Sequence, residues 1–124
     1  MKYKFSVVFA LLVLSCQSVR QLVNKQYVDG DGVNISYVTA GEGQPLVLIH
    51  AGGLDKGMWQ NQLRELSKYF RVLAYDVRGH GSRVSTSNYQ FEIDDLNALL
   101  NQEVLDQKIS ILGCYLGASI DLDY

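Results

Sequence analysis

Three short glycine-rich segments hold most of the side chains in this sequence that could do chemistry. They read His50-Ala51-Gly52-Gly53, Asp76-Val77-Arg78-Gly79-His80-Gly81-Ser82 and Gly113-Cys114-Tyr115-Leu116-Gly117. Between them they offer imidazoles, a carboxylate, a thiol and a phenol, which are groups that transfer protons or attack electrophiles. Each segment directly follows an apolar run, so each is expected to be a turn at the end of a strand.

The elements that must position these turns are buried strands. The apolar runs are Leu46–Ile49, Val72–Tyr75 and Ile109–Leu112. Continuous apolar strands separated by helix-length segments are typical of a parallel sheet. Ligands of open α/β sheets bind outside the carboxyl ends of the strands, so the three turns are expected to share one edge of the sheet.

Two amphipathic segments and a hairpin complete the predicted domain. The first helix carries Trp59, Leu63, Leu66 and Phe70 at helical spacing, with Asp55 as its N-cap. The second carries Ile93, Leu96, Leu100 and Val104. Asp94 and Asp95 are expected near its N-terminus, where the helix dipole favours negative charge. A strand from Gln26 leads into Asp29–Gly32, after which alternating apolar residues predict a hairpin.

Several other kinds of site are excluded by spacing and charge. Gly52 and Gly57 match the glycines of a Walker A loop, but Met58 stands where that motif needs lysine. A calcium loop starting at Asp29 would need different residues at its fifth, sixth and twelfth positions. The net charge of −2 offers no basic face for nucleic acid. We therefore expect no metal ion, no cofactor and no nucleic-acid partner.

Together the three turns resemble those of the α/β-hydrolase superfamily. His50-Ala51-Gly52, followed by Asp55 and Met58-Trp59, resembles the oxyanion turn of one branch. The second turn matches the Asp-x-Arg-Gly-x-Gly signature, and the third has the form of the G-x-S-x-G nucleophile elbow. The resemblance implies an α/β fold over residues 26–124: a partial α/β-hydrolase fold with an N-terminal hairpin, parallel strands and flanking helices, truncated after the elbow.

The resemblance also implies a role for each turn. The oxyanion donors would be backbone N–H groups of Gly52, Gly53 and Leu116. The turns themselves would be shaped by His50, Asp76, Arg78, Gly79, Gly81, Gly113 and Gly117, with hydrogen bonds from Asp76 and Arg78. A catalytic role for His50 or His80 is the alternative, although the general-base histidine of this family comes after the nucleophile and the acid.

One residue departs from the family at the decisive position, because Tyr115 stands where the elbow has serine. A phenol ring extends past the point where serine places its hydroxyl, and its pKa near 10 keeps it protonated. If Cys114 were the nucleophile instead, Leu112 and Leu116 would stand two residues on either side of it, where the motif needs small residues. Cys114 is therefore expected to be a small buried side chain. Family members also continue to an acid and a histidine that are not in this sequence.

By lineage the chain is thus a hydrolase of small ester, amide, lactone or carbon–carbon bonded substrates that is expected to be inactive as written. A lipid-anchored, non-catalytic binding module or pseudoenzyme is an alternative. In that case a second chain could complete the sheet, because Ile109–Leu112 is expected at an edge. An interrupted gene product is a further alternative.

The N-terminus has the pattern of an export signal. Lys2 and Lys4 precede an apolar run, Phe5–Leu14, that is too short to span a bilayer, and Ser15-Cys16 follows. Val13 to Cys16 resembles a bacterial lipobox, which predicts a lipidated Cys16 on a membrane-anchored protein of the cell envelope, outside the cytoplasm. The expected organisation is a signal at residues 1–15, a tether at 16–25 and the hydrolase domain at 26–124.

Overall fold

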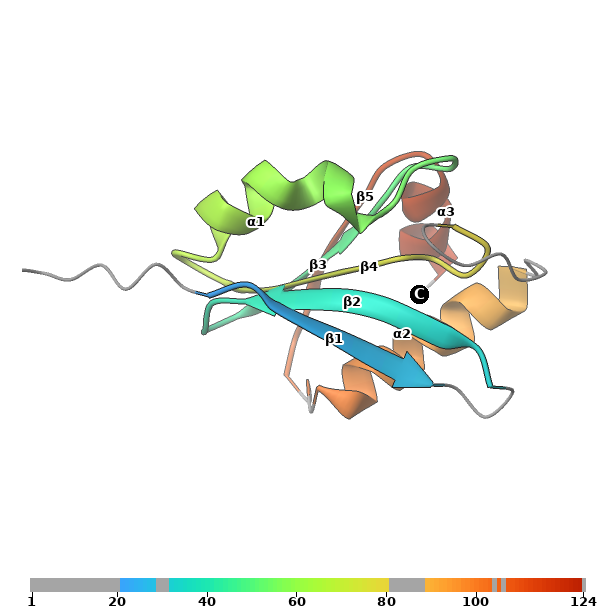
Figure 1. The fold of residues 1–124 in the computed structure, drawn as a ribbon, viewed down its shortest axis with the longest axis horizontal. Coiled ribbons are helices and arrows are strands. Elements are labelled where there is room, and N and C mark those ends of the chain that lie inside the picture. The colour runs from blue at the N-terminus through green and yellow to red at the C-terminus, as the bar shows by residue number, and fades with distance from the viewer. Residues whose placement is uncertain (1–20, 29–31, 81–88, 104, 106, 124) are drawn as a thin grey trace, which may run out of the picture.

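The computed structural model of this chain describes residues 21–28, 32–80, 89–103, 105 and 107–123. A five-stranded sheet lies between helices on both of its faces (Figure 1). The strands are β1 (Val23–Val28), β2 (Asn34–Ala40), β3 (Pro45–Ile49), β4 (Arg71–Tyr75) and β5 (Ser110–Gly113). The helices are the 3₁₀ turn η1 (Lys56–Trp59), α1 (Gln60–Leu66), α2 (Tyr89–Gln102) and α3 (Leu116–Asp123).

The strand order confirms the predicted hairpin and the predicted parallel strands. Across the sheet the order is β1-β2-β4-β3-β5. β2 pairs antiparallel with both β1 and β4, whereas β3 pairs parallel with both β4 and β5. The carboxyl ends of the three parallel strands therefore lie at one edge, as the apolar runs indicated. Within the described part of the chain, β5 is an edge strand that pairs with β3 alone.

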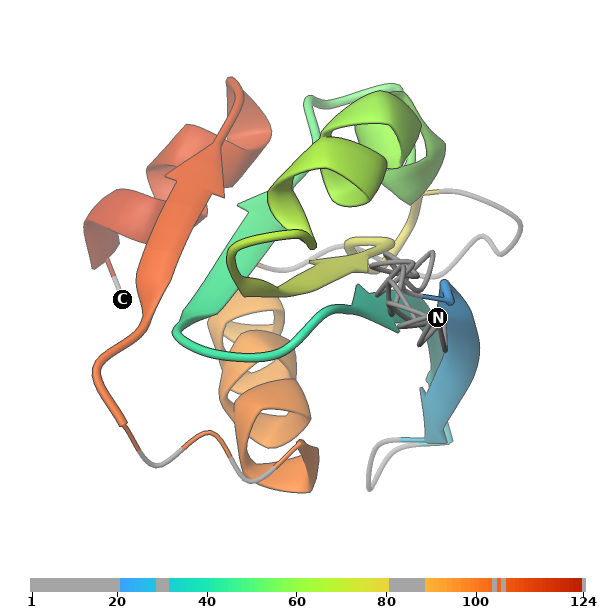
Figure 2. The same cartoon turned by 90° about the vertical axis from the view of Figure 1, so that its left-hand side faces the viewer.

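One face of the sheet is covered by η1 and α1 (Figure 2). Trp59 and Leu63 are buried there, and Leu66 and Phe70 pack beside them. Asp55 is an N-cap, but of the η1 turn that leads into α1: its carboxylate accepts a hydrogen bond of 2.7 Å from the Gly57 amide. The helix is shorter than the apolar spacing predicted. It ends at Leu66, so Phe70 reaches the same core from the turn that leads into β4.

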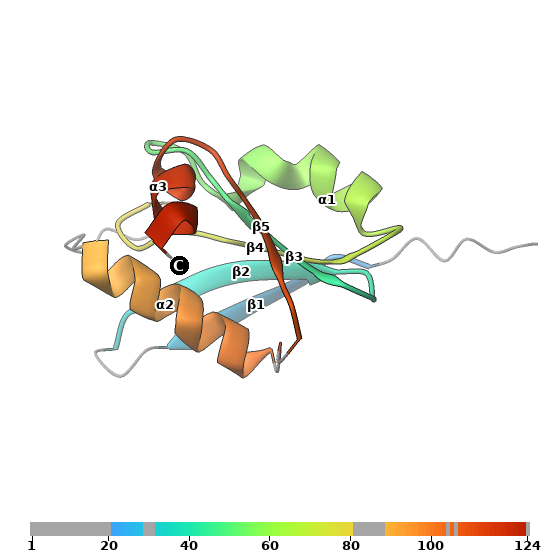
Figure 3. The ribbon, with the colours of Figure 1, turned by 180° about the vertical axis from the view of Figure 1, so that it is seen from behind.

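The opposite face is covered by α2 and α3 (Figure 3). Leu96, Leu99 and Leu100 of α2 and Ile120 of α3 are almost completely buried against the sheet. Val47, Ile49, Leu73 and Tyr75 supply the strand side of this core. Because β3 and β4 are buried on both faces, they have the continuous apolar character from which a parallel sheet was predicted.

The first strand begins three residues before Gln26, where the sequence predicted it. β1 begins at Val23, and the Cα partners of its register run from Val23 and Thr39 to Val28 and Asn34. The sequence did not predict the first part of this strand because Lys25 is a charged residue within it. It forms a salt bridge of 2.8 Å with Glu103, a buried carboxylate just beyond α2. Residues 21 and 22 lead into β1, and residues 23–25 are its first part. The predicted signal and Cys16 lie outside the described residues.

The predicted position of Asp94 and Asp95 at a helix N-terminus is wrong. α2 begins at Tyr89, so both aspartates lie beyond the first turn, where the helix dipole has little effect. Sequence spacing located the buried face of this helix correctly but not its start, since the residues before Ile93 carry no clear apolar period. Val104, the last predicted core position, lies outside the described residues. No helix within the described ranges has the length and apolar character needed to cross a membrane.

Candidate functional site

The third glycine-rich turn is a sharp bend between β5 and α3. Tyr115 stands at its apex with a φ of 51°, and it is the one non-glycine residue in the described part of the chain with a positive φ. For an L-residue this left-handed conformation costs about 1–2 kcal/mol. Its side chain is 85% exposed, so packing of the phenol does not stabilise the conformation. The surrounding backbone must hold the bend.

The two flanking glycines show how the bend is held. A Cβ atom on Gly113 would lie 2.2 Å from the backbone of Gly117, and a Cβ on Gly117 would lie 2.4 Å from the carbonyl oxygen of Ile49. Neither contact could be relieved by moving a side chain. Glycines are therefore required at both positions because β3, β5 and the start of α3 approach each other closely, whichever residue occupies position 115.

Among the backbone amides beside the bend, those of Gly52 and Leu116 have no hydrogen-bond acceptor within the described residues. The amides that follow in α3 are satisfied, since Gly117 donates to Cys114 and Ala118 donates to Tyr115. Gly52 and Leu116 are also near neighbours, because a Cβ on Gly52 would lie 3.8 Å from the Cβ of Leu116. The first and third turns thus bring two unpaired donors together beside Tyr115.

His50 is completely buried and ties the first turn to the second. Its Nε2 accepts a hydrogen bond of 3.0 Å from the Val77 amide, and its Nδ1 lies 2.8 Å from the Ala51 carbonyl oxygen. An amide can only donate and a carbonyl can only accept, so the ring must be neutral with its proton on Nδ1. Burial accordingly lowers the pKa of His50. Both ring nitrogens are engaged, which argues against a role as general base.

Asp76 links the same two turns from the other side. Its carboxylate accepts a hydrogen bond of 2.8 Å from the Lys56 amide and forms a salt bridge of 2.7 Å with the Lys56 ammonium group. The expected hydrogen bonds of Asp76 therefore run to the loop after β3. Lys56 was not singled out in the sequence, because no motif of either loop requires a cation at that position.

Arg78 is also hydrogen-bonded, and its partner lies in α2. The guanidinium group forms bonds of 2.8 and 2.6 Å to the two carboxylate oxygens of Asp95, and both side chains are almost fully buried. The same guanidinium lies 4.9 Å from the ring centre of Phe91. This pair explains why Asp95 is buried in mid-helix, and it fixes the second turn against α2.

His80 and Glu92 lie close to this pair. The ring of His80 is 5.3 Å from that of His50, and its Nδ1 lies 3.2 Å from the Arg78 carbonyl oxygen. Glu92 is 4% exposed, and burial raises the pKa of its carboxyl group against the opposing influence of His80. These groups are part of the support beneath the second turn. Gly79 has a φ of 79°, which suits a tight turn, and Gly81 lies outside the described residues.

The remaining candidate, Cys114, does not point into an open site. It is partly buried, packs against the α1-side core, and donates its amide to the Ile49 carbonyl oxygen. In the described part of the chain no cluster of three or more His, Cys, Asp or Glu side chains could hold a metal ion. A hollow of about 310 Å³ lies next to the first turn, lined by Gly53, Leu54, Asp55 and Met58.

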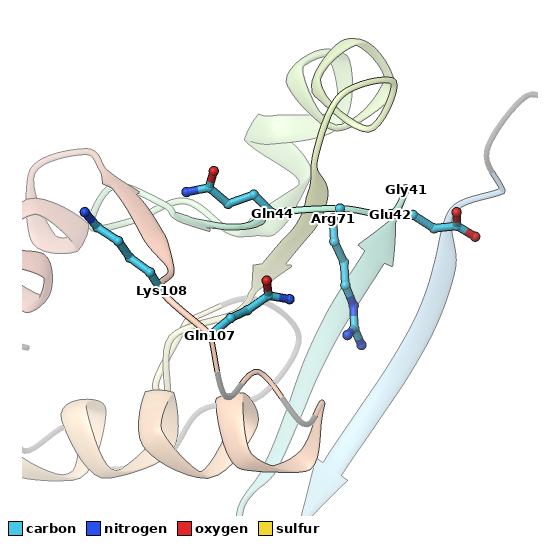
Figure 4. A pocket seen from close by; sticks show the side chains of 7 residues that line it. Gly41, Glu42, Gln44, Arg71, Gln107 and Lys108 are labelled. Atoms are coloured by element: carbon cyan, nitrogen blue, oxygen red, sulfur yellow. The ribbon is translucent and has the colours of Figure 1, made fainter.

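A larger hollow lies at the other end of the sheet (Figure 4). It has a volume of about 810 Å³ and is lined by Gly41, Glu42, Gly43, Gln44, Arg71, Gln107 and Lys108. The labelled side chains do not converge, since Lys108 and Glu42 point away from each other. Arg71 already bonds to Glu103 at 2.9 Å. This hollow therefore lacks the convergent polar groups of a binding site.

An open sheet with helices on both faces and a strand–bend–helix nucleophile turn defines the α/β-hydrolase class of architecture. Residues 44–117 match the family described as alpha/beta hydrolase fold. The chain belongs to this family. Over 104 residues it is 32% identical to 2-hydroxy-6-oxo-6-(2'-aminophenyl)hexa-2,4-dienoic acid hydrolase of Metapseudomonas resinovorans, which covers 79% of this chain and 36% of that protein.

Solved structures give the same result. The epoxide hydrolase CorEH superimposes with a TM-score of 0.72 and 28% identity, over 82% of this chain and 36% of the other. An esterase from Thermogutta terrifontis superimposes with a TM-score of 0.69 and 31% identity, over 82% of this chain and 39% of the other. The partial α/β-hydrolase fold expected from the sequence is thus confirmed. The chain spans well under half the length of these relatives.

Proposed function

We propose that the edge formed by the three turns is a hydrolase-type acyl or carbonyl site in which Tyr115 has replaced the nucleophile. The observation that carries the proposal is that the bend has the geometry of a nucleophile turn around an altered side chain. Tyr115 has the left-handed backbone and close glycine contacts of a nucleophile turn, while its phenol is 85% exposed to solvent. The relatives include a hydrolase named for a hydroxy-oxo dienoic acid and an esterase.

The proposed ligand contacts are the amides of Gly52 and Leu116. Two unpaired N–H groups on neighbouring residues beside a nucleophile turn are suited to an oxyanion or a carboxylate, because they supply hydrogen bonds without needing to reorganise. Gly53, the third candidate donor, lines the adjoining hollow with Leu54, Asp55 and Met58, so the side chains of Leu54 and Met58 offer an apolar contact for the rest of a small ligand and Asp55 a polar one. The site would therefore bind a small acid, ester or ketone.

Tyr115 is not expected to support serine-type turnover. Covalent catalysis needs a small nucleophile next to a base, and the one histidine buried near the turns, His50, has both nitrogens engaged. We therefore expect the wild-type chain to give no turnover of p-nitrophenyl acetate above the buffer rate and no labelling by a fluorophosphonate probe. Turnover that disappears in Tyr115→Phe, which retains the ring and loses the hydroxyl, would overturn this part of the proposal.

Ligand binding can be tested separately from turnover. In a titration with butyrate followed by amide NMR, the signals of Gly52 and Leu116 should shift. The amides of Gly117 and Ala118 serve as internal controls, since they already donate within the turn. Equal shifts at all four amides, or none at any, would contradict a site built on the two unpaired donors.

A second proposal concerns the edge of the sheet. β5 pairs only with β3 in the described chain, and Leu112 is 44% exposed, whereas the apolar residues of β3 opposite it are fully buried. An apolar edge of this kind favours pairing with another strand. As a non-catalytic binding module, the chain would form a stable, folded complex with a second chain at β5, and Leu112→Lys would weaken it. A monomeric, molten protein in light scattering and circular dichroism would count against this proposal.

We further propose that the chain is anchored to a membrane of the cell envelope through a lipidated Cys16. The support is the lipobox-like sequence that ends at this cysteine. Mass spectrometry of the N-terminal peptide from an expressing bacterium should show cleavage before Cys16 and added acyl mass. Cys16→Ala should abolish both, and an unmodified wild-type cysteine in the membrane fraction would refute the anchor.

A further inference from the structure

Met58 makes an unusual contact with the first turn. Its Sδ accepts a hydrogen bond of 3.4 Å from the backbone amide of Ala51, which lies between His50 and Gly52. Ala51 is only 8% exposed, so this amide depends on a protein acceptor. The sulfur therefore helps to set the direction of the peptide groups that lead into Gly52.

Three side chains hold this turn, and they differ in chemical stability. His50 bonds to the Val77 amide, Lys56 forms a salt bridge with Asp76, and Met58 in η1 accepts a hydrogen bond from the Ala51 amide. The imidazole and the ammonium group keep their bonding under mild oxidation. A thioether does not, because peroxides convert it to a polar sulfoxide.

The sulfur side chain is also reachable. Met58 is partly exposed and lines the open hollow of about 310 Å³ together with Gly53, Leu54 and Asp55. Its other side packs against the buried core that contains Trp59 and Leu63. A small oxidant in solvent can therefore approach the sulfur while the aliphatic part of the side chain remains anchored.

We propose that Met58 is an oxidation site through which hydrogen peroxide changes the conformation of residues 50–53. One peroxide oxygen is transferred to the sulfur, which loses two electrons and becomes the sulfoxide, and the peroxide is reduced to water. The Sδ–amide distance of 3.4 Å leaves no room for an added oxygen between the two atoms, since an N–H···O bond alone occupies about 2.9 Å. The sulfoxide must turn away or the turn must shift, and either change alters the environment of Ala51.

The composition of the chain makes this reaction easy to follow. Its methionines are Met1 and Met58, so peptide mapping assigns the added oxygen directly. Trp59 is the single tryptophan and is the next residue along the chain, so its fluorescence reports the local structure. The full chain would be titrated with hydrogen peroxide in a Cys114→Ala background, which removes the partly buried thiol as a competing target.

We expect Met58 to gain one oxygen, the Trp59 emission to shift, and exchange of the Ala51 amide to accelerate about fivefold, the value of one typical hydrogen bond. A methionine sulfoxide reductase should reverse all three changes. Met58→Leu, which keeps the apolar volume without sulfur, should show no emission shift with peroxide. If that variant does not fold, mapping and reversal in the methionine-containing protein still decide the question.

Two results would overturn the proposal: resistance of Met58 to peroxide in the folded protein, or a sulfoxide that leaves both the Trp59 emission and the Ala51 amide unchanged. This inference depends on the proposed function only where it treats Gly52 as a contact of the ligand. Its readouts need no ligand, so failure of butyrate to bind would leave it standing, and failure of the peroxide response would leave ligand binding intact.

Discussion

The buried pair between Arg78 and Asp95 allows a quantitative test of how the second turn is held. Both side chains are nearly inaccessible, with 6% and 3% exposure, and two hydrogen bonds join them. Asp95→Asn retains the shape of the side chain but removes the charge that the guanidinium group faces. The buried cation then loses this counter-charge in a medium of low polarity, which is the condition under which loss of one partner is most costly.

The expected magnitude follows from the burial of the pair. Breaking a buried ion pair by removing one partner costs about 3–5 kcal/mol. Domains of this size unfold with a free energy of about 5–15 kcal/mol, so Asp95→Asn should remove a large share of the stability. The double variant Arg78→Met/Asp95→Leu should be less destabilised than Asp95→Asn, because it removes both charges of the pair and adds apolar packing next to Phe91.

The assay is urea unfolding followed by circular dichroism, with Asp94→Asn as the control. Asp94 precedes Asp95 in the same helix and is exposed, so its substitution should change the unfolding free energy by only about 0.5 kcal/mol. Equal effects of Asp94→Asn and Asp95→Asn would refute the reasoning. A double variant that is less stable than Asp95→Asn would refute the claim that loss of the Asp95 counter-charge is the dominant cost.

Three further predictions concern the turns and the titrating groups. Gly117→Ala should lower the unfolding free energy by about 3 kcal/mol, because its Cβ would lie 2.4 Å from the Ile49 carbonyl oxygen, while Gly52→Ala should be tolerated in the same urea assay. Burial acts to raise the pKa of Glu103, but its hydrogen bonds outweigh burial, so the pKa is lowered. The stability that this carboxylate contributes is therefore complete above pH 4.5 and is lost on acidification. Glu103→Gln should flatten that part of the profile of unfolding free energy against pH. The lowered pKa of His50 means that stability falls as the pH drops below about 6.5, and NMR should show its ring neutral with the proton on Nδ1 through that range.

Much of the architecture could be predicted because it depends on local patterns. Continuous apolar runs identify strands buried on two faces, and three of them were located to within a residue or two. The glycines at 113 and 117 and the signature of the second turn marked the bends between elements. Helix ends were less predictable, since α2 starts four residues before Ile93 and α1 stops before Phe70. At those ends the chain follows tertiary contacts rather than its own period.

Sequence alone determined that the chain has the turns of an α/β-hydrolase and that a tyrosine occupies the nucleophile position, because both are properties of residue type and spacing. The tertiary structure decided which groups meet. It paired Arg78 with Asp95, Asp76 with Lys56 and the Met58 sulfur with Ala51, and it set the neutral form of His50. These contacts join segments whose separation along the chain carries no periodic signal, so only the folded arrangement of the strands could bring them within hydrogen-bond distance.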